Sequence, residues 1–268
     1  MQIIQNKPPQ CIYIETYTNP KNKRGRTQMP FEKYQYIIDQ IISIKTKRIK
    51  LFFNTDSFKN KDSLYLIGYA KNHNLNIDVQ TRLKALHEKE ICSLNALLDN
   101  GDNVYINLEY NILDNSDIKT ASKYYHYLKR ENERKINKCN IFINTDNKEI
   151  MKDKERQDIY NKIISESNSK LNIEQVNQKM IMGDKLIPIS HNISLIKFEN
   201  KCNKYCAWHQ LVVLINGDIV FCNMDYQGQM VVGNVFETNL INIWNGKGIT
   251  QWRKKINGEY KCLDCLPS

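Results

Sequence analysis

The stretch CAWHQLVVLINGDIVFC, from Cys206 to Cys222, decides the fold of the last quarter of the chain. Two apolar runs flank the dipeptide Asn216-Gly217, and this pattern is the strongest short signal for a β-hairpin. A hairpin returns the chain to the end at which it started. We therefore expect Cys222 to lie beside the segment that precedes the hairpin.

Cysteines concentrate in this part of the sequence. The chain closes on KCLDCLPS, and five of its eight cysteines lie in the last quarter: Cys202, Cys206, Cys222, Cys262 and Cys265. One sulfur before the hairpin, one after it and two from the terminal CxxC can meet. Four thiolates suit either a structural zinc or a [4Fe–4S] cluster, and spacing alone leaves that choice open.

Length and composition indicate a globular protein. The chain has 268 residues, of which 41% are hydrophobic, enough for one large domain or for a large domain with a small one. No apolar run reaches the length of about 18 residues that indicates a spanning helix. The start, MQIIQNKPPQ, lacks the pattern of a signal peptide, so we expect a cytoplasmic protein. In that reducing compartment, clustered cysteines are metal ligands more often than disulfides.

The formal net charge of +10 favours acidic partners. The lysines are spread along the whole chain and mixed with acidic residues, instead of forming one basic segment. Nucleic-acid binding therefore stays an alternative to the main interpretation. The sequence pattern predicts no particular oligomeric state.

Ahead of the cysteine-rich region, short apolar strands alternate with amphipathic helices. We expect strands at 11–16, 48–53, 75–81, 103–109, 138–144 and 170–176, and helices at 30–45, 61–74, 85–101, 117–132 and 149–167. This alternation predicts parallel βαβ units and an open β/α barrel, whose sites lie at the carboxyl ends of the strands. The expected organisation is an α/β partial barrel over residues 1–195 and a small cysteine-rich α+β domain over residues 196–268.

The region from Cys202 to Cys265 resembles the SPASM-type auxiliary-cluster domain that follows radical SAM barrels. The shared pattern is a cysteine near a Trp, a strand, a Gly-Asp turn, V-x-C-x-x-D, GN-hydrophobic, L-x-x-I-W-N and a terminal CxxC. The resemblance implies one [4Fe–4S] cluster. Its implied ligands are Cys206, Cys222, Cys262 and Cys265, with Cys202 as the alternative to Cys206.

The alternating region resembles the six-stranded partial barrel of radical SAM proteins. In that family, the loop after the first strand has the form T-N-x-C-N-x-x-C-x-x-C, and its cysteines hold the cluster that binds and cleaves S-adenosylmethionine. Here the segment reads IETYTNPKNKRGRTQMPFEKY. Thr18 and Asn19 match the start of the motif, but Lys21, Gly25 and Gln28 stand in place of the cysteines.

A second family motif, the G-G-E-P-like turn after the second strand, is also altered. This chain has FFNTDSFKNKD, in which Asn54 and Thr55 replace the glycines and Asp56 replaces the glutamate. Asp56 is thus the remnant of the S-adenosylmethionine site that the resemblance implies.

Together these features predict a degenerate radical SAM–SPASM protein. It would keep the auxiliary cluster, be unable to cleave S-adenosylmethionine by itself, and act as a binding or partner-dependent redox protein. A protein or peptide partner is expected at the barrel mouth. The alternatives are an active radical SAM enzyme with unusual ligands and a zinc-stabilised nucleic-acid-binding protein.

Overall fold

The computed structural model describes residues 7–18, 20, 24–25, 27–53, 55–81, 86, 88–99, 101–109, 139–144, 174–175, 179–182, 185–188, 206–223 and 225–257. The chain forms two compact units. The first combines Met1–Asp78 with Ile193–Ser268, and the second comprises Val79–Asn192. The domain boundary expected between residues 195 and 196 falls outside the described residues and stays a prediction.

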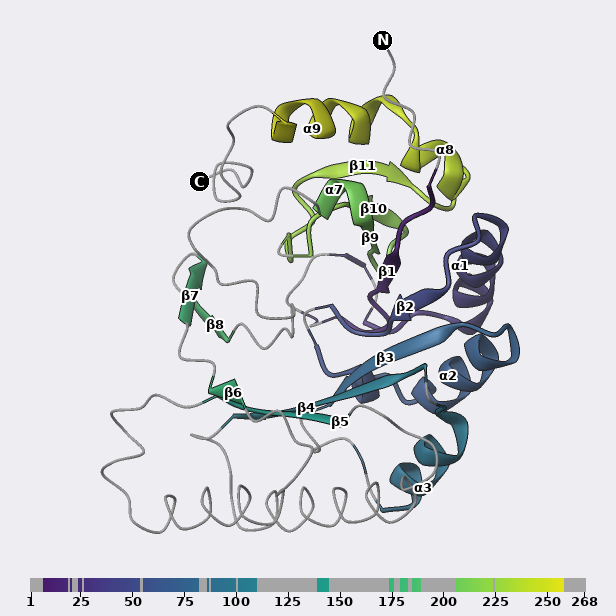
Figure 1. The fold of residues 1–268 in the computed structure, drawn as a ribbon, viewed down its shortest axis with the longest axis vertical. Coiled ribbons are helices and arrows are strands. Elements are labelled where there is room, and N and C mark those ends of the chain that lie inside the picture. Colours follow the sequence, from purple (N-terminus) through teal and green to yellow (C-terminus); the bar gives the residue numbers. More distant parts are fainter. Residues whose placement is uncertain are drawn as a thin grey trace. The chain divides into compact units, whose positions relative to one another are not determined.

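A sheet with both parallel and antiparallel strands forms the centre of the first unit (Figure 1). Its strands are β1 (Cys11–Ile14), β2 (Arg48–Lys50), the start of β3 (Asn76–Thr81), β9 (Gln210–Val213), β10 (Asp218–Val220) and β11 (Val231–Asn234). Their order is β11-β10-β9-β1-β2-β3. Strand β1 pairs in parallel with both β2 and β9, so Tyr13 lies between Lys50 and Val212. The cysteine-rich hairpin thus continues the sheet that β1 begins.

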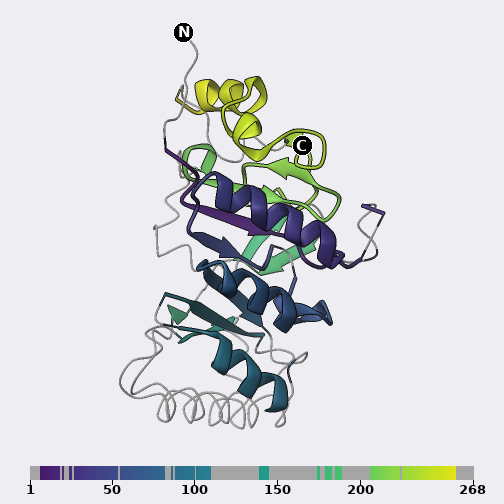
Figure 2. The same ribbon diagram turned by 90° about the vertical axis from the view of Figure 1, so that its right-hand side faces the viewer.

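Two amphipathic helices cover one face of β1, β2 and β3 (Figure 2). Helix α1 (Phe31–Ser43) begins directly after Pro30, where the missing N–H of proline costs no hydrogen bond. It buries the apolar side chains that share its three-and-four spacing: Tyr34, Ile37, Ile38 and Ile41. Helix α2 (Ser63–Asn72) packs beside α1 and follows the short 3-10 helix η1 (Ser57–Lys59).

Three further helices flank the hairpin: α7 (Cys206–His209), α8 (Leu240–Trp244) and α9 (Lys247–Asn257). The Gln40 side chain of α1 donates to Asn239 Oδ1 at 3.2 Å and accepts from the Leu240 amide at 3.0 Å. The fully buried Trp244 donates its indole N–H to the Lys7 carbonyl at 2.9 Å. These bonds join the last part of the chain to its first part.

The second unit has helix α3 (Glu88–Leu97) and the parallel strands β4 (Asn103–Glu109), β5 (Cys139–Asn144) and β6 (Glu174–Gln175). It also has an antiparallel pair that the sequence pattern did not predict, β7 (Lys179–Met182) and β8 (Lys185–Pro188). The helices expected at 117–132 and 149–167 lie outside the described residues. The predicted α/β architecture with largely parallel strands is confirmed. In the described part of the chain, no helix is both long and apolar enough to cross a membrane.

Candidate functional site

The hairpin predicted between Cys206 and Cys222 is present. Strands β9 and β10 pair in antiparallel fashion, with Val213 opposite Ile219. Gly217 occupies the turn with a φ of 92°, a conformation that side chains with a Cβ rarely adopt. Asn234, at the end of β11, donates its side-chain N–H to Asp218 Oδ1 at 2.9 Å and holds the base of the turn.

The hairpin brings the Cys206 and Cys222 segments to the same end. Cys206 begins α7, which leads directly into β9, and Cys222 follows β10. Gln210, the first residue of β9, donates its side-chain N–H to Asn223 Oδ1 at 3.1 Å. Cys222 is buried, with 4% of its surface exposed. The two segments therefore meet as the sequence predicts.

A buried carboxylate fixes the backbone after Cys222. Asp225 is 1% exposed, and its amide donates to the Cys222 carbonyl at 3.1 Å. Its two carboxylate oxygens accept from the amides of Gln229 and Met230, at 2.9 and 2.7 Å. This bonding explains the V-x-C-x-x-D pattern, because the aspartate closes the turn in which the cysteine sits.

Helix α9 contacts both cysteine segments through consecutive residues. The Trp252 ring packs on the Phe221 ring beside Cys222, with 5.3 Å between centroids. Arg253 donates its Nε–H to the carbonyl of Ala207, the neighbour of Cys206, at 2.9 Å. The helix ends at Asn257, shortly before the terminal CxxC.

The other predicted ligands are outside the described part of the chain. Cys202, Cys262, Cys265 and the side chain of Cys206 all fall there. Among the described residues, no group of three or more His, Cys, Asp or Glu side chains is arranged to hold a metal. Ligation by Cys206, Cys222, Cys262 and Cys265 therefore stays a prediction.

The loop after β1 is closed on itself by backbone contacts. Tyr17 and Gln28 form an antiparallel bridge, and the Thr18 amide donates to the Thr27 carbonyl at 2.9 Å. The enclosed sequence, TNPKNKRGRT, contains no cysteine. The loop therefore returns the chain to α1 without offering a thiolate.

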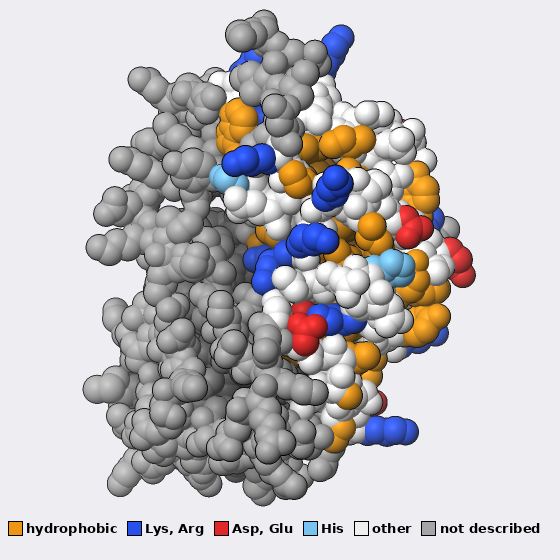
Figure 3. Space-filling view, turned by 45° about the vertical axis from the view of Figure 1, so that its right-hand side comes forward, with side chains coloured by type: hydrophobic (Ala, Val, Ile, Leu, Met, Phe, Trp, Pro, Cys, Tyr) orange, Lys and Arg blue, Asp and Glu red, His pale blue; other side chains and the backbone are white. Residues whose placement is uncertain are grey.

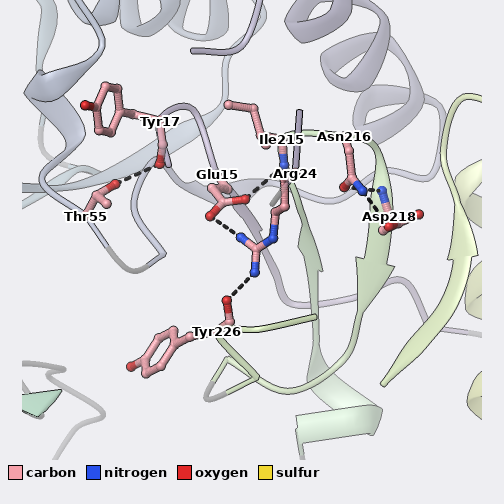
Figure 4. Close-up of polar contacts among 8 residues, drawn as sticks. All are labelled: Glu15, Tyr17, Arg24, Thr55, Ile215, Asn216, Asp218 and Tyr226. Atoms are coloured by element: carbon pink, nitrogen blue, oxygen red, sulfur yellow. Dashed lines mark hydrogen bonds and ion pairs between the residues drawn. The ribbon is translucent and has the colours of Figure 1, made fainter. Parts of the chain in front are cut away.

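A buried ion pair lies in this loop (Figure 4). Arg24 reaches back to pair with Glu15, the residue directly after β1, and the two side chains are 8% and 0% exposed. The same guanidinium donates to the Tyr226 carbonyl. The second Glu15 oxygen accepts from the Ile215 amide at 3.0 Å. The pair thus joins the loop to both the hairpin turn and the segment after Cys222.

Asp56, the expected remnant of the second motif, lies after β2 and is 3% exposed. Its Oδ1 accepts from the Phe58 amide at 2.8 Å, which makes it the N-cap of η1. The preceding Thr55 donates its hydroxyl to the Tyr17 carbonyl at 2.8 Å (Figure 4). The Thr55 bond thereby supports the loop after β1. Asp56 itself stabilises the start of η1, whatever it binds.

Charged side chains also line one face of β1, β2 and β3. Asp78 forms an ion pair with Arg48, and its other oxygen lies 3.8 Å from Lys50 Nζ. The Lys50 ammonium also lies 4.9 Å from the centre of the Tyr13 ring. Two cations and one carboxylate of the described residues thus meet on this face. Elsewhere on the described surface in Figure 3, Lys and Arg side chains are scattered among acidic and apolar ones, in agreement with the sequence.

Sequence reasoning missed Glu15 and Arg253. Glu15 directly follows a buried strand, and a charged residue next to a buried strand indicates a buried polar contact. Arg253 stands four residues after the fully buried Ile249, and so occupies an apolar-face position of α9. A charged residue at a buried position needs a polar or charged partner. This rule could have identified both Glu15 and Arg253 as candidate functional residues.

Comparison with known proteins identifies the cysteine-rich region. Residues 202–266 match the SPASM family, an iron–sulfur cluster-binding domain. No curated protein matches the chain.

Several solved structures share the fold. BtrN in an open conformation aligns with a TM-score of 0.56 at 15% identity, over 98% of this chain and 94% of BtrN. Native anSMEcpe with bound AdoMet and Kp18Cys peptide aligns with a TM-score of 0.60 at 11% identity, over 93% of this chain and 84% of anSMEcpe. Streptococcus suis SuiB bound to precursor peptide SuiA aligns with a TM-score of 0.52 at 12% identity, over 91% and 66%.

The chain therefore shares the fold of BtrN, anSMEcpe and SuiB, as the resemblance to the radical SAM barrel predicts, and its residues 202–266 match the SPASM family as the cysteine pattern predicts.

Proposed function

We propose that this protein is a degenerate radical SAM–SPASM protein. It holds one [4Fe–4S] cluster through Cys206, Cys222, Cys262 and Cys265, and does not cleave S-adenosylmethionine by itself. It acts as a binding or partner-dependent redox protein. The observation that carries the proposal is the buried Arg24–Glu15 pair in a loop without cysteine.

The residues of the barrel loop do not fit a cluster. Iron–sulfur clusters are held by cysteine thiolates, with histidine as a rarer ligand, and the segment from Glu15 to Pro30 contains neither. Arg24 brings a guanidinium to the end of β1, and Glu15 accepts hydrogen bonds with both of its oxygens. A cation and a closed loop thus take the place of the metal ligands.

Described residues of the C-terminal region support a cluster there. The buried Cys222 thiol and the start of α7 lie at one end of the hairpin, and Asp225 fixes the turn between them and β11. The Nη2 group of the buried Arg253 has no hydrogen-bond partner among the described residues. When bound, a [4Fe–4S] cluster supplies one-electron transfer and cross-links the segments that hold it.

A partner at the barrel mouth completes the proposal. SuiB and anSMEcpe have been solved with peptides, which supports a protein or peptide partner for this chain.

The test is metal analysis after anaerobic purification, with single cysteine variants. We expect iron and sulfide in equal amounts, and loss of both in Cys222→Ala and Cys262→Ala. Cys92→Ala, which removes a half-buried thiol of α3, is the matched control and should keep its iron. Cys202→Ala and Cys206→Ala decide which of the two is the first ligand. Zinc without iron would instead support the zinc-stabilised alternative.

A further inference from the structure

Arg253 is a buried cation without a counter-ion in the described part of the chain. Its side chain is fully buried, and its Nε and Nη1 groups donate to the Ala207 and Trp244 carbonyls at 2.9 and 2.7 Å. The guanidinium carbon lies 4.2 Å from the Trp244 ring centre and 5.3 Å from that of Trp208. Nη2 has no hydrogen-bond partner among the described residues.

These contacts do not compensate the charge. Carbonyl dipoles and aromatic faces stabilise a guanidinium only partly, and a buried ion without an opposite charge is strongly unfavourable. Burial lowers the pKa of Arg253 to about 10, so the group remains a cation at neutral pH. The site therefore calls for an anion near Nη2.

The position of Arg253 indicates which anion this is. The residue bonds the carbonyl next to Cys206, and the preceding Trp252 packs against the residue next to Cys222. A short segment of the sequence separates α9 from Cys262. An iron–sulfur cluster with four cysteine thiolates carries net negative charge and accepts hydrogen bonds at its sulfurs.

We propose that Arg253 is the counter-cation of the SPASM cluster, and that its Nη2–H group donates to a sulfur atom of that site. This inference rests on the proposed function. Uptake of one electron adds one negative charge to the cluster, and a cation beside it stabilises the reduced form. Arg253 therefore raises the reduction potential of the cluster as well as positioning α7 against α9.

The potential is measured by stepwise reduction with dithionite, followed by electron paramagnetic resonance. We expect Arg253→Gln to shift the ratio of reduced to oxidised cluster at least tenfold toward the oxidised form, which for one electron is a fall of about 59 mV. Arg253→Lys keeps the positive charge and should shift the reduction potential less than Arg253→Gln does. Lys254→Gln removes a charge from an exposed position of the same helix and is the matched control. Equal shifts in Arg253→Gln and Lys254→Gln, or none in Arg253→Gln, would overturn the inference.

A measurement on the unaltered protein covers the case in which the variants do not fold. The chain is labelled with ¹⁵N-arginine, and the reduced cluster is examined by pulsed electron paramagnetic resonance. We expect a ¹⁵N coupling from one guanidinium close to the cluster. An iron-loaded protein without that coupling overturns the role of Arg253 alone, whereas a protein without iron overturns the proposed function and this inference together.

Discussion

Replacing Arg24 by methionine removes the cation that stands at the end of β1. The substitution leaves the Glu15 carboxylate, whose side chain is 0% exposed, with the Ile215 amide as its remaining donor among the contacts described above. Removing one partner of a buried ion pair costs about 3 to 5 kcal/mol, because the other charge stays buried. We expect the lower part of that range, since the Arg24 side chain is 8% exposed instead of fully buried.

The double variant Arg24→Met/Glu15→Gln separates the ion pair from ordinary packing. Glutamine keeps an acceptor for the Ile215 amide but carries no charge, so the double variant should be more stable than Arg24→Met alone. The double-mutant cycle should give a coupling energy of about 2 kcal/mol or more. Glu32→Gln, at an exposed position of α1, is the control and should change stability by less than about 0.5 kcal/mol.

The assay is equilibrium unfolding in urea followed by tryptophan fluorescence. All three tryptophans, Trp208, Trp244 and Trp252, belong to the same compact unit as the ion pair, so the signal reports on that unit. A coupling energy near zero, or an Arg24→Met variant as stable as Glu32→Gln, would refute the claim that this pair replaces the metal ligands as the support of the loop.

Three further substitutions test the local geometry. Gly217→Ala should lower the unfolding midpoint in urea by more than Gly25→Ala, because a Cβ at Gly217 would lie 2.2 Å from the Phe236 ring, whereas Gly25 shares a positive φ but has no atom within 4 Å. Asp225→Asn should cost about 1 to 3 kcal/mol in the same assay and speed iron loss to a chelator, because the charged acceptor of two amides is lost. Tyr34→Phe should stabilise the protein by about 1 kcal/mol at neutral pH, because the hydroxyl is buried without a partner among the described residues. Burial raises the pKa of the Tyr34 hydroxyl, so the unfolded chain releases this proton at a lower pH than the folded chain does. The stability of the folded protein therefore falls as the pH rises above about 10. The midpoint of thermal unfolding should fall less with pH in Tyr34→Phe than in the unaltered protein.

Local patterns were sufficient to predict most of the elements. The periodicity of α1 and the Asn216-Gly217 turn each act over a few neighbouring residues, and both appear where the sequence places them. The pairing of β1 with β9 joins residues 199 positions apart, and the bond between Ile215 and Glu15 spans 200 positions. No local propensity encodes such a pairing, so the sequence did not show that the cysteine-rich hairpin extends the sheet.

For the candidate site, the structure describes only the hairpin and its two cysteine segments. The hairpin has a short-range signal and brings the Cys206 and Cys222 segments together as predicted, whereas the part played by the terminal CxxC stays a prediction. The missing cysteines of the barrel loop were also visible in the sequence. The use of Arg24, Glu15 and Arg253 depends on burial and on partners far along the chain, and only the fold shows these.

The most direct measurement of the central claim combines the iron content of anaerobically purified protein with an assay for 5′-deoxyadenosine. The protein is reduced and incubated with S-adenosylmethionine, and the product is quantified by mass spectrometry. We predict about four irons per chain, as for one [4Fe–4S] cluster, and no 5′-deoxyadenosine. About eight irons, or formation of 5′-deoxyadenosine, would contradict the account and establish a radical enzyme with unusual ligands.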